Sequence, residues 1–248
     1  IPQGDWSSDV CSSDLKTAIM MTLTKFGIRE WGLGGVVTLA VLAGCWWLIC
    51  RGGFPATGWI VAVIAVILFA GFAAFFRNPS RKIPADPALL VSPADGVVRD
   101  IGVVEDFNFP PFTGRAQRIG VFLSVLNVHV NRAPAELAVE SKYYREGEYL
   151  DARNSECARR NEAMTIAGTA SAAGKKFPMA VRQISGAIAR RIVCPVEPGR
   201  QLKKGEVYGM IKFGSRTELY LPLDGVEINV KVGDRVYGGE TVMATVKE

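Results

Sequence analysis

The stretch Val196-Glu-Pro-Gly-Arg-Gln-Leu-Lys-Lys-Gly-Glu206 decides the fold, because the chain contains it twice. The second copy is Val230-Lys-Val-Gly-Asp-Arg-Val-Tyr-Gly-Gly-Glu240, at a constant offset of 34 residues. Both copies follow the pattern Val-x-x-Gly-x-x-apolar-x-x-Gly, in which the glycines permit tight turns between short strands. An internal repeat of this kind predicts two similar halves that pack against each other.

The repeat resembles the half-hammerhead of biotinyl and lipoyl modules. Short apolar runs broken by glycine and proline fill residues 83–248, a pattern typical of a β-rich domain. We therefore expect a mainly β (α+β) fold whose core is a barrel-sandwich of two pseudo-duplicated half-hammerheads. Pro93-Ala-Asp-Gly96 and Pro222-Leu-Asp-Gly225 either extend this duplication or are two ordinary turn sequences.

Two uncharged runs precede this domain, at about residues 34–50 and 58–76. Each approaches the ~20 residues that a helix needs to cross a bilayer. We expect residues 21–82 to form a two-helix membrane hairpin with both ends facing the cytoplasm, because most of the flanking basic residues lie outside the short linker. The alternatives are two buried core helices, or a hairpin that lies in the membrane without spanning it.

Composition narrows the choice of function. The net charge of +5 suits a surface that faces anionic lipid headgroups, but the basic residues are scattered, so we expect no nucleic-acid partner. A single histidine and isolated cysteines give no spacing for a metal site. Residues 1–20 repeat Ser-Ser-Asp and resemble translated adapter sequence, so we expect a non-native or disordered leader there and a natural start at Met20 or Met21.

The dipeptide Gly214-Ser215 lies between the two copies of the repeat. It is either a plain turn or the scissile bond of a self-cleaving protein. Glycine does not crowd its carbonyl, so the next serine hydroxyl can attack it and convert the amide to an ester. Elimination and hydrolysis would then leave an N-terminal pyruvoyl group made from Ser215, which serves as an electron sink in place of pyridoxal phosphate.

Two further residues could assist such a serine. Asp95 lies in the turn sequence Ser92-Pro-Ala-Asp-Gly96, and His129 is the only side chain whose ordinary pKa lies near neutrality. With Ser215 they supply a nucleophile, a base and a carboxylate that orients the base. Both residues also have purely structural interpretations, and their separations along the chain do not define a geometry.

Five motifs occur in the order found in the phosphatidylserine decarboxylase family. The chain resembles most closely the short, bacterial membrane-bound form, from the hairpin to the C-terminus. The motifs are Phe75-Phe-Arg-Asn-Pro-Ser-Arg81, Ser92-Pro-Ala-Asp-Gly96, Asn127-Val-His-Val-Asn-Arg-Ala-Pro134, Ser185-Gly-Ala-Ile-Ala-Arg-Arg-Ile-Val193 and Met210-Ile-Lys-Phe-Gly-Ser-Arg216.

The resemblance implies autocatalytic cleavage between Gly214 and Ser215, and a covalent pyruvoyl cofactor derived from Ser215. It implies that His129 takes a proton from Ser215, that Asp95 orients the ring, and that His129 returns a proton after CO2 leaves. The substrate would be phosphatidylserine in the bilayer and the product phosphatidylethanolamine. The enzyme would lie in the inner membrane with its catalytic domain facing the cytoplasm, as paired α and β chains and with a homodimer as a further possibility.

One departure from the family concerns the histidine motif. Longer members have His-x-x-His-x-Pro, whereas this chain has His129 at the first position and Arg132 at the second. A single histidine therefore serves processing, turnover or both. Arg132, Arg190 and Arg191 are candidate contacts for the lipid phosphate, or else part of a solvated patch. The alternative functions are a pyruvoyl decarboxylase for another amino-acid-bearing lipid and a non-enzymatic membrane-tethered adaptor.

Overall fold

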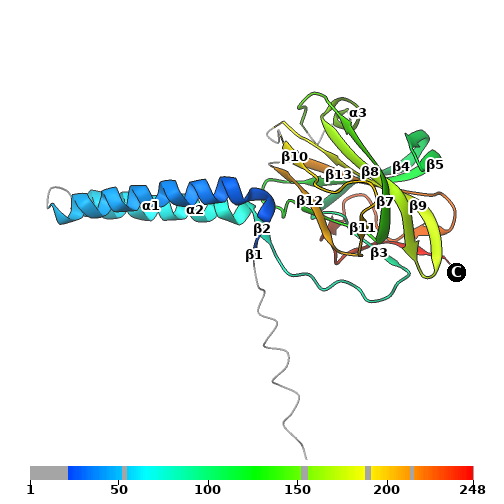
Figure 1. The fold of residues 1–248 in the computed structure, drawn as a ribbon, viewed down its shortest axis with the longest axis horizontal. Coiled ribbons are helices and arrows are strands. Elements are labelled where there is room, and N and C mark those ends of the chain that lie inside the picture. Colours follow the sequence, from blue (N-terminus) through cyan, green and yellow to red (C-terminus); the bar gives the residue numbers. More distant parts are fainter. Residues whose placement is uncertain (1–21, 52–54, 152–155, 188–190, 213–214, 248) are drawn as a thin grey trace, which may run out of the picture.

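The computed structural model describes residues 22–51, 55–151, 156–187, 191–212 and 215–247. Gly214 and the leader predicted at residues 1–20 lie outside these ranges. Figure 1 shows two long helices running side by side away from a β domain. They are α1 (Ile28–Cys50) and α2 (Pro55–Phe75). The mainly β fold with two apolar N-terminal helices is confirmed.

The two helices are long and apolar enough to cross a membrane. Within their most apolar windows only 6% and 11% of the residues are buried, so they are not core helices of the β domain. The helix α1 begins at Ile28 rather than near Gly34, because the turn before it is capped by the Thr24 side chain and Trp31 packs against the domain. The helix α2 extends from Pro55, a residue that suits a helix N-terminus.

The base of the hairpin is attached to the domain by a small aromatic cluster. Phe75 and Phe76 pack with Met210 of the β domain, and Phe26, Trp31 and Phe72 complete the cluster. Outside the hairpin the chain forms β1 (Thr22–Leu23), paired with β2 (Arg77–Asn78), and the short 3-10 turn η2 (Lys25–Gly27). The segment that enters α1 and the segment that leaves α2 are therefore joined by strand pairing beside the domain.

The β domain is built around an eight-stranded antiparallel sheet with the order β11-β7-β8-β9-β13-β5-β4-β15. Its strands are β4 (Gly96–Phe109), β5 (Phe112–Leu123), β7 (Glu136–Arg145), β8 (Ala163–Ala172), β9 (Lys175–Ile184), β11 (Gln201–Leu202), β13 (Ser215–Leu221) and β15 (Arg235–Val236). The short helix α3 (Cys157–Arg160) precedes β8. This sheet curls around the main apolar core, which includes Leu90, Ile119, Leu137, Met179 and Leu219.

Two three-stranded sheets complete the domain. One has the order β10-β12-β6, formed by β10 (Arg191–Val193), β12 (Val207–Lys212) and β6 (Val130–Arg132). The other has the order β14-β16-β3, formed by β14 (Val226–Ile228), β16 (Val242–Val246) and β3 (Leu89–Val91). Each small sheet therefore contains the two strands that flank one copy of the repeat and one strand from an earlier part of the chain.

The duplication is visible in matched backbone hydrogen bonds. Gly199 N donates to Val139 O at 2.7 Å, and Gly233 N donates to Val98 O at 2.8 Å. Both glycines have positive φ, 91° and 100°, a conformation that favours glycine and explains their place in the repeat. The two copies contain β11 and β15, which form the two opposite edges of the large sheet. The predicted pair of half-hammerheads is thus present.

The duplication also extends to an earlier pair of segments, though not to the pair suggested by the sequence. Val91 N donates to Pro134 O, and Arg132 N donates to Pro93 O, both at 2.9 Å. These reciprocal bonds relate Pro93-Ala94 to Pro134-Ala135. Pro222-Leu-Asp-Gly225 is instead the turn between β13 and β14, where Gly225 has a φ of 78°.

Candidate functional site

Ser215 is the first residue of β13, a central strand of the large sheet. Its backbone lies opposite Leu123 of β5, and the residue is fully buried. The Oγ atom has no hydrogen-bond partner among the described residues. A buried hydroxyl without a partner costs about 1–3 kcal/mol, so an unpaired group of this kind in a native fold calls for a functional explanation.

Alternation along β13 places Ser215 on the inner face of the sheet. Leu219 and Leu221 belong to the main core, and Thr217 bonds to Asn131 of the small sheet. Because side chains two residues apart share a face, Ser215 lies on the same side as these three residues. Arg216, Glu218 and Tyr220 occupy the outer face.

A buried amide network lies next to Ser215 on this inner face. Asn131 Nδ2 donates to Thr217 Oγ1 at 2.9 Å and to Pro93 O at 3.4 Å, while Gln183 Nε2 donates to Asn131 Oδ1 at 2.8 Å. Neither Thr217 nor Gln183 belongs to a sequence pattern that points to a site. The only available signal was that Asn131 lies within the histidine motif.

His129 lies where the helical hairpin meets the small sheet β10-β12-β6. Its ring is 4.3 Å from the ring of Phe75, the last residue of α2, with an interplanar angle of 36°. The Nδ1 atom lies 2.9 Å from Asn127 O. A carbonyl can only accept, so Nδ1 carries the proton and Nε2 of the neutral ring carries the lone pair. Burial, together with a smaller effect of the nearby Arg77 charge, lowers the pKa of His129 to about 4, despite the opposing effect of the Asn127 bond.

The structure gives the Asp95 carboxylate partners other than His129. It accepts hydrogen bonds from Arg81 at 2.7 and 2.9 Å and from the backbone of Gly238 at 2.8 Å. Burial raises the pKa of Asp95, against the opposing effect of the Arg81 charge. Arg81 also contacts Glu240, so it joins the chain leaving α2 to the second copy of the repeat. Through Arg81, Asp95 thus holds in place the segment of chain that follows α2, here called the connecting segment.

The three arginines suggested as phosphate contacts have different environments. Arg132 is buried, and its guanidinium donates to Gly205 O, Pro79 O and the Asn78 side chain. It therefore supports the same connecting segment and is not available to a lipid phosphate. Arg191 is exposed, with Glu30 of α1 at 3.9 Å. Arg190 lies outside the described residues.

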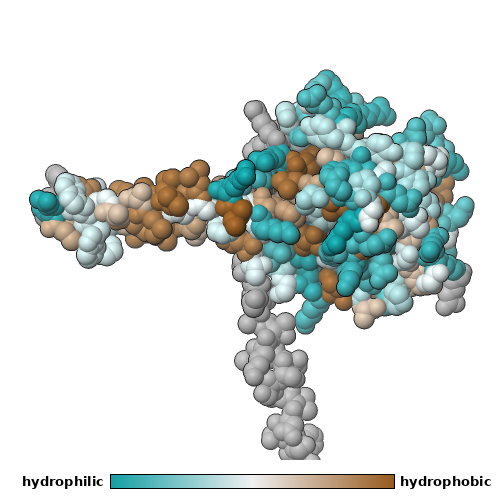
Figure 2. Space-filling model, in the orientation of Figure 1, coloured by the Kyte–Doolittle hydropathy of each residue, from teal (hydrophilic) through white to brown (hydrophobic). Residues whose placement is uncertain are grey.

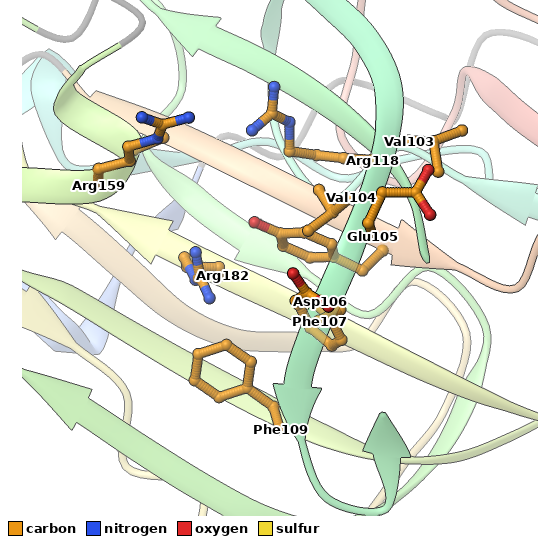
Figure 3. A pocket seen from close by; sticks show the side chains of 11 residues that line it. Val103, Val104, Glu105, Asp106, Phe107, Phe109, Arg118, Arg159 and Arg182 are labelled. Atoms are coloured by element: carbon orange, nitrogen blue, oxygen red, sulfur yellow. The ribbon is translucent and has the colours of Figure 1, made fainter. Parts of the chain in front are cut away.

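A cavity of about 460 Å³ lies on the outer face of the sheet. Figure 3 shows three arginines that line it, Arg118, Arg159 and Arg182. Tyr220 lines the same cavity. Because Tyr220 projects from the outer face of β13, this cavity is separated from Ser215 by the sheet. It contains none of the three predicted site residues.

These features describe a duplicated β domain with an unpaired serine at the head of a central strand and a membrane-type hairpin packed against its histidine. The family model for phosphatidylserine decarboxylase matches residues 68–244. This range includes His129, Ser215 and both copies of the repeat. The chain therefore belongs to the phosphatidylserine decarboxylase family, as its five motifs predicted.

Individual relatives agree with this assignment. A protein from Carboxydothermus hydrogenoformans is 46% identical over 82% of this chain and 95% of its own length. Others from Rhodopirellula baltica and Trichlorobacter lovleyi are 43% and 42% identical, over 84% and 74% of this chain and 80% of their own lengths. All three are named phosphatidylserine decarboxylase proenzyme.

Proposed function

We propose that this chain is a proenzyme that cleaves itself before Ser215 and then converts phosphatidylserine to phosphatidylethanolamine and CO2. The observation that carries the proposal is the fully buried, unpaired Ser215 hydroxyl directly after a glycine, in a family whose relatives are named proenzymes. This hydroxyl fits a pyruvoyl precursor, because no structural bond would be lost when it reacts.

Cleavage proceeds in three balanced steps. The Ser215 Oγ attacks the Gly214 carbonyl and transfers its proton to a base, and the peptide nitrogen is released as an amine, which leaves an ester. Loss of the Ser215 α-proton then expels the carboxylate of Gly214 and leaves dehydroalanine. Water converts this residue, through its imine form, to the pyruvoyl group and ammonia. No external oxidant or reductant is needed.

His129 is the proposed base for the first step. Its Nδ1 proton is held by Asn127 O, so the lone pair lies on Nε2. The lowered pKa keeps the ring neutral at pH 7, as a base must be before it accepts a proton. The pyruvoyl group supplies an electron sink for decarboxylation. His129 then donates the proton that replaces CO2, so one histidine serves both processing and turnover.

We assign Asp95 a positioning role in place of direct orientation of the imidazole. Its bond to Arg81 and the Arg132 bonds to Asn78 and Pro79 hold the segment that leaves α2. That segment begins two residues after Phe75, whose ring packs on His129. Asp95 would therefore act on the histidine through the connecting segment.

The cleaved chains would remain associated. The strand β13 of the small α chain pairs with β5 on one side and β9 on the other. The strands β15 and β16 of the same chain pair with β4 and β3. Because cleavage leaves each copy of the repeat on a different chain, this shared network of strands would hold the two chains together, along with side-chain bonds such as that of Arg81 to Glu240.

The hairpin would span the bilayer and place the site at the membrane surface. Arg77, just beyond α2, donates to Leu126 O at 2.5 Å, and Leu126 is 85% exposed. Figure 2 shows apolar surface along the helix pair and apolar patches on the part of the domain nearest to it. An exposed leucine beside a membrane helix suits contact with lipid. We propose an inner-membrane location with the domain in the cytoplasm.

The proposal is tested with the purified full chain and its Ser215→Ala variant. Wild type should yield two chains and release CO2 from phosphatidylserine, whereas the variant should remain a single inactive chain. An uncleaved wild type that is active would contradict the mechanism. Turnover of a different amino-acid-bearing lipid, with none of phosphatidylserine, would support the alternative decarboxylase.

A further inference from the structure

A row of buried polar side chains crosses the inner face of the sheet beside Ser215. Ile184 lies opposite both Arg216 of β13 and Ala163 of β8. Continuing both registers by one residue places Ser185 opposite Ser215 on one side and Glu162 on the other. The bond from Ser185 N to Glu162 O, at 3.0 Å, supports the second pairing. Directly opposite residues have Cβ atoms about 5 Å apart, so the three side chains are neighbours on one face.

These side chains lack the partners that buried polar groups normally have. Glu162 Oε2, Ser185 Oγ and Ser215 Oγ are all buried without a hydrogen-bond partner among the described residues. Glu162 is 8% exposed, and its other oxygen, Oε1, accepts from Tyr144 Oη at 3.1 Å. Several unpaired groups in one row are difficult to explain by folding alone, because each carries a desolvation cost.

Gln183 adds a further unpaired acceptor on the same face. Its Oε1 is buried without a partner, and its Nε2 donates to Asn131 Oδ1. The amide orientation is determined by Pro93 O, which can only accept and so requires Asn131 Nδ2 as its donor. Because the proposed cleavage removes the Ser215 hydroxyl, the unpaired atoms that remain are two acceptor oxygens and the Ser185 hydroxyl. Such a set suits a cationic hydrogen-bond donor and disfavours a phosphate or carboxylate.

The row is also held in place by its neighbours. Asn161 Nδ2 donates to Ser185 O and to Leu150 O, both at 2.8 Å, and its Oδ1 accepts from Leu150 N at 2.9 Å. All polar atoms of the Asn161 side chain thus support the backbone around Ser185 and Glu162. This arrangement positions the row without using its unpaired atoms.

We propose that Glu162 and Ser185 form a binding site for an alkylammonium group beside Ser215. The identity of the ligand rests on the proposed function, since in that reaction the group is the amine of the serine headgroup and later the ammonium of the product. The lipid phosphate binds elsewhere.

Glu162→Gln tests this site because it removes the charge but keeps an oxygen for Tyr144. The probes are dihexanoyl-phosphatidylethanolamine and dihexanoyl-phosphatidylglycerol, which differ in the ammonium group. The readout is the rise in thermal unfolding temperature of the cleaved, detergent-solubilised enzyme, because a ligand stabilises the state that it binds. Wild type should favour the ethanolamine lipid by about tenfold in affinity, as one charge-assisted bond would give.

The Glu162→Gln enzyme should lose this preference and show a raised KM for dihexanoyl-phosphatidylserine. Ser185→Ala should weaken the preference by about threefold, and it provides an independent test where the glutamate variant does not fold. Glu197→Gln, at an exposed residue paired with Lys142, is the matched control. The proposed ammonium site would be contradicted by a Glu162→Gln enzyme that keeps the full preference for the ethanolamine lipid. A variant with lower kcat and an unchanged KM would contradict it as well.

Self-cleavage separates this proposal from the proposed function. The Glu162→Gln and Ser185→Ala chains should still be cut before Ser215, which also reports that they fold. If wild type is not cut and does not decarboxylate phosphatidylserine, the proposed function has failed whatever the binding data show. If cutting and turnover are normal but both variants retain the wild-type headgroup preference, the ammonium site alone has failed.

Discussion

The ring of Phe75 packs on the ring of His129 at a distance of 4.3 Å. Phe75 is the last residue of the second apolar helix, and His129 is the only histidine in the chain. The membrane hairpin and the proposed proton carrier of the site therefore share one contact. In the proposed function, Phe75 would therefore contribute both to anchoring the protein to lipid and to setting the pKa of His129.

Phe75→Ala should make self-cleavage sensitive to mild acid. Removing the ring lets water reach His129, so the histidine pKa rises from about 4 toward its ordinary value of 6.5. A protonated ring cannot accept the serine proton, so the cleavage rate at pH 6 should fall severalfold relative to pH 8. Wild type should show almost no difference between these pH values. Phe72→Ala removes a neighbouring ring that contacts Phe76, and its pH profile should match wild type.

Folding stability should fall as the pH drops from about 6.5 to 4. In this window the unfolded chain binds a proton at His129 and the folded chain does not, so acid favours unfolding. The loss is on the order of 3 kcal/mol for a shift of this size. Denaturant unfolding of the uncleaved Ser215→Ala chain measures it. A His129→Gln version should lose less stability over the same range; equal losses would rule out His129 as the cause.

Asp95→Asn should slow cleavage by loosening the segment after α2. The change leaves the buried Arg81 without its charged partner, at a cost of about 3 kcal/mol. Arg81→Met should slow cleavage to a similar degree, and the double variant should be little worse than either single one. Glu240→Gln, which removes the weaker partner of Arg81, is the milder control. Normal cleavage in Arg81→Met with none in Asp95→Asn would show that Asp95 acts directly at the reacting groups.

Leu126→Asp should reduce turnover of phosphatidylserine in vesicles without changing self-cleavage. A charge at this exposed position would oppose contact with lipid, by about 1 kcal/mol or roughly fivefold in rate. Turnover of short-chain, soluble phosphatidylserine should remain near wild type. Val232→Asp places the same charge at another exposed residue, in the turn of the second repeat, and should have no effect on vesicles. Equal losses on both substrates would argue against membrane contact at Leu126.

Much of the fold could be predicted because it repeats. The glycines at 199 and 233 occupy equivalent turns with positive φ, and their spacing is visible in the sequence. The proposed alkylammonium site could not be predicted from the sequence. Its residues, Glu162 and Ser185, become neighbours of Ser215 only through the register of three strands. Residue types alone suggested that Asp95 orients His129, because a carboxylate can play that part. In the structure its carboxylate oxygens instead accept hydrogen bonds from Arg81 and from the backbone of Gly238.

The most direct test of the central claim is the intact mass of the purified protein under denaturing conditions. We expect two chains, one ending at Gly214 and one spanning residues 215–248. The smaller chain should be lighter by one ammonia than a peptide that begins with serine, and it should react with a carbonyl reagent. A single full-length chain in an active preparation, or a small chain with a free serine amine, would contradict it.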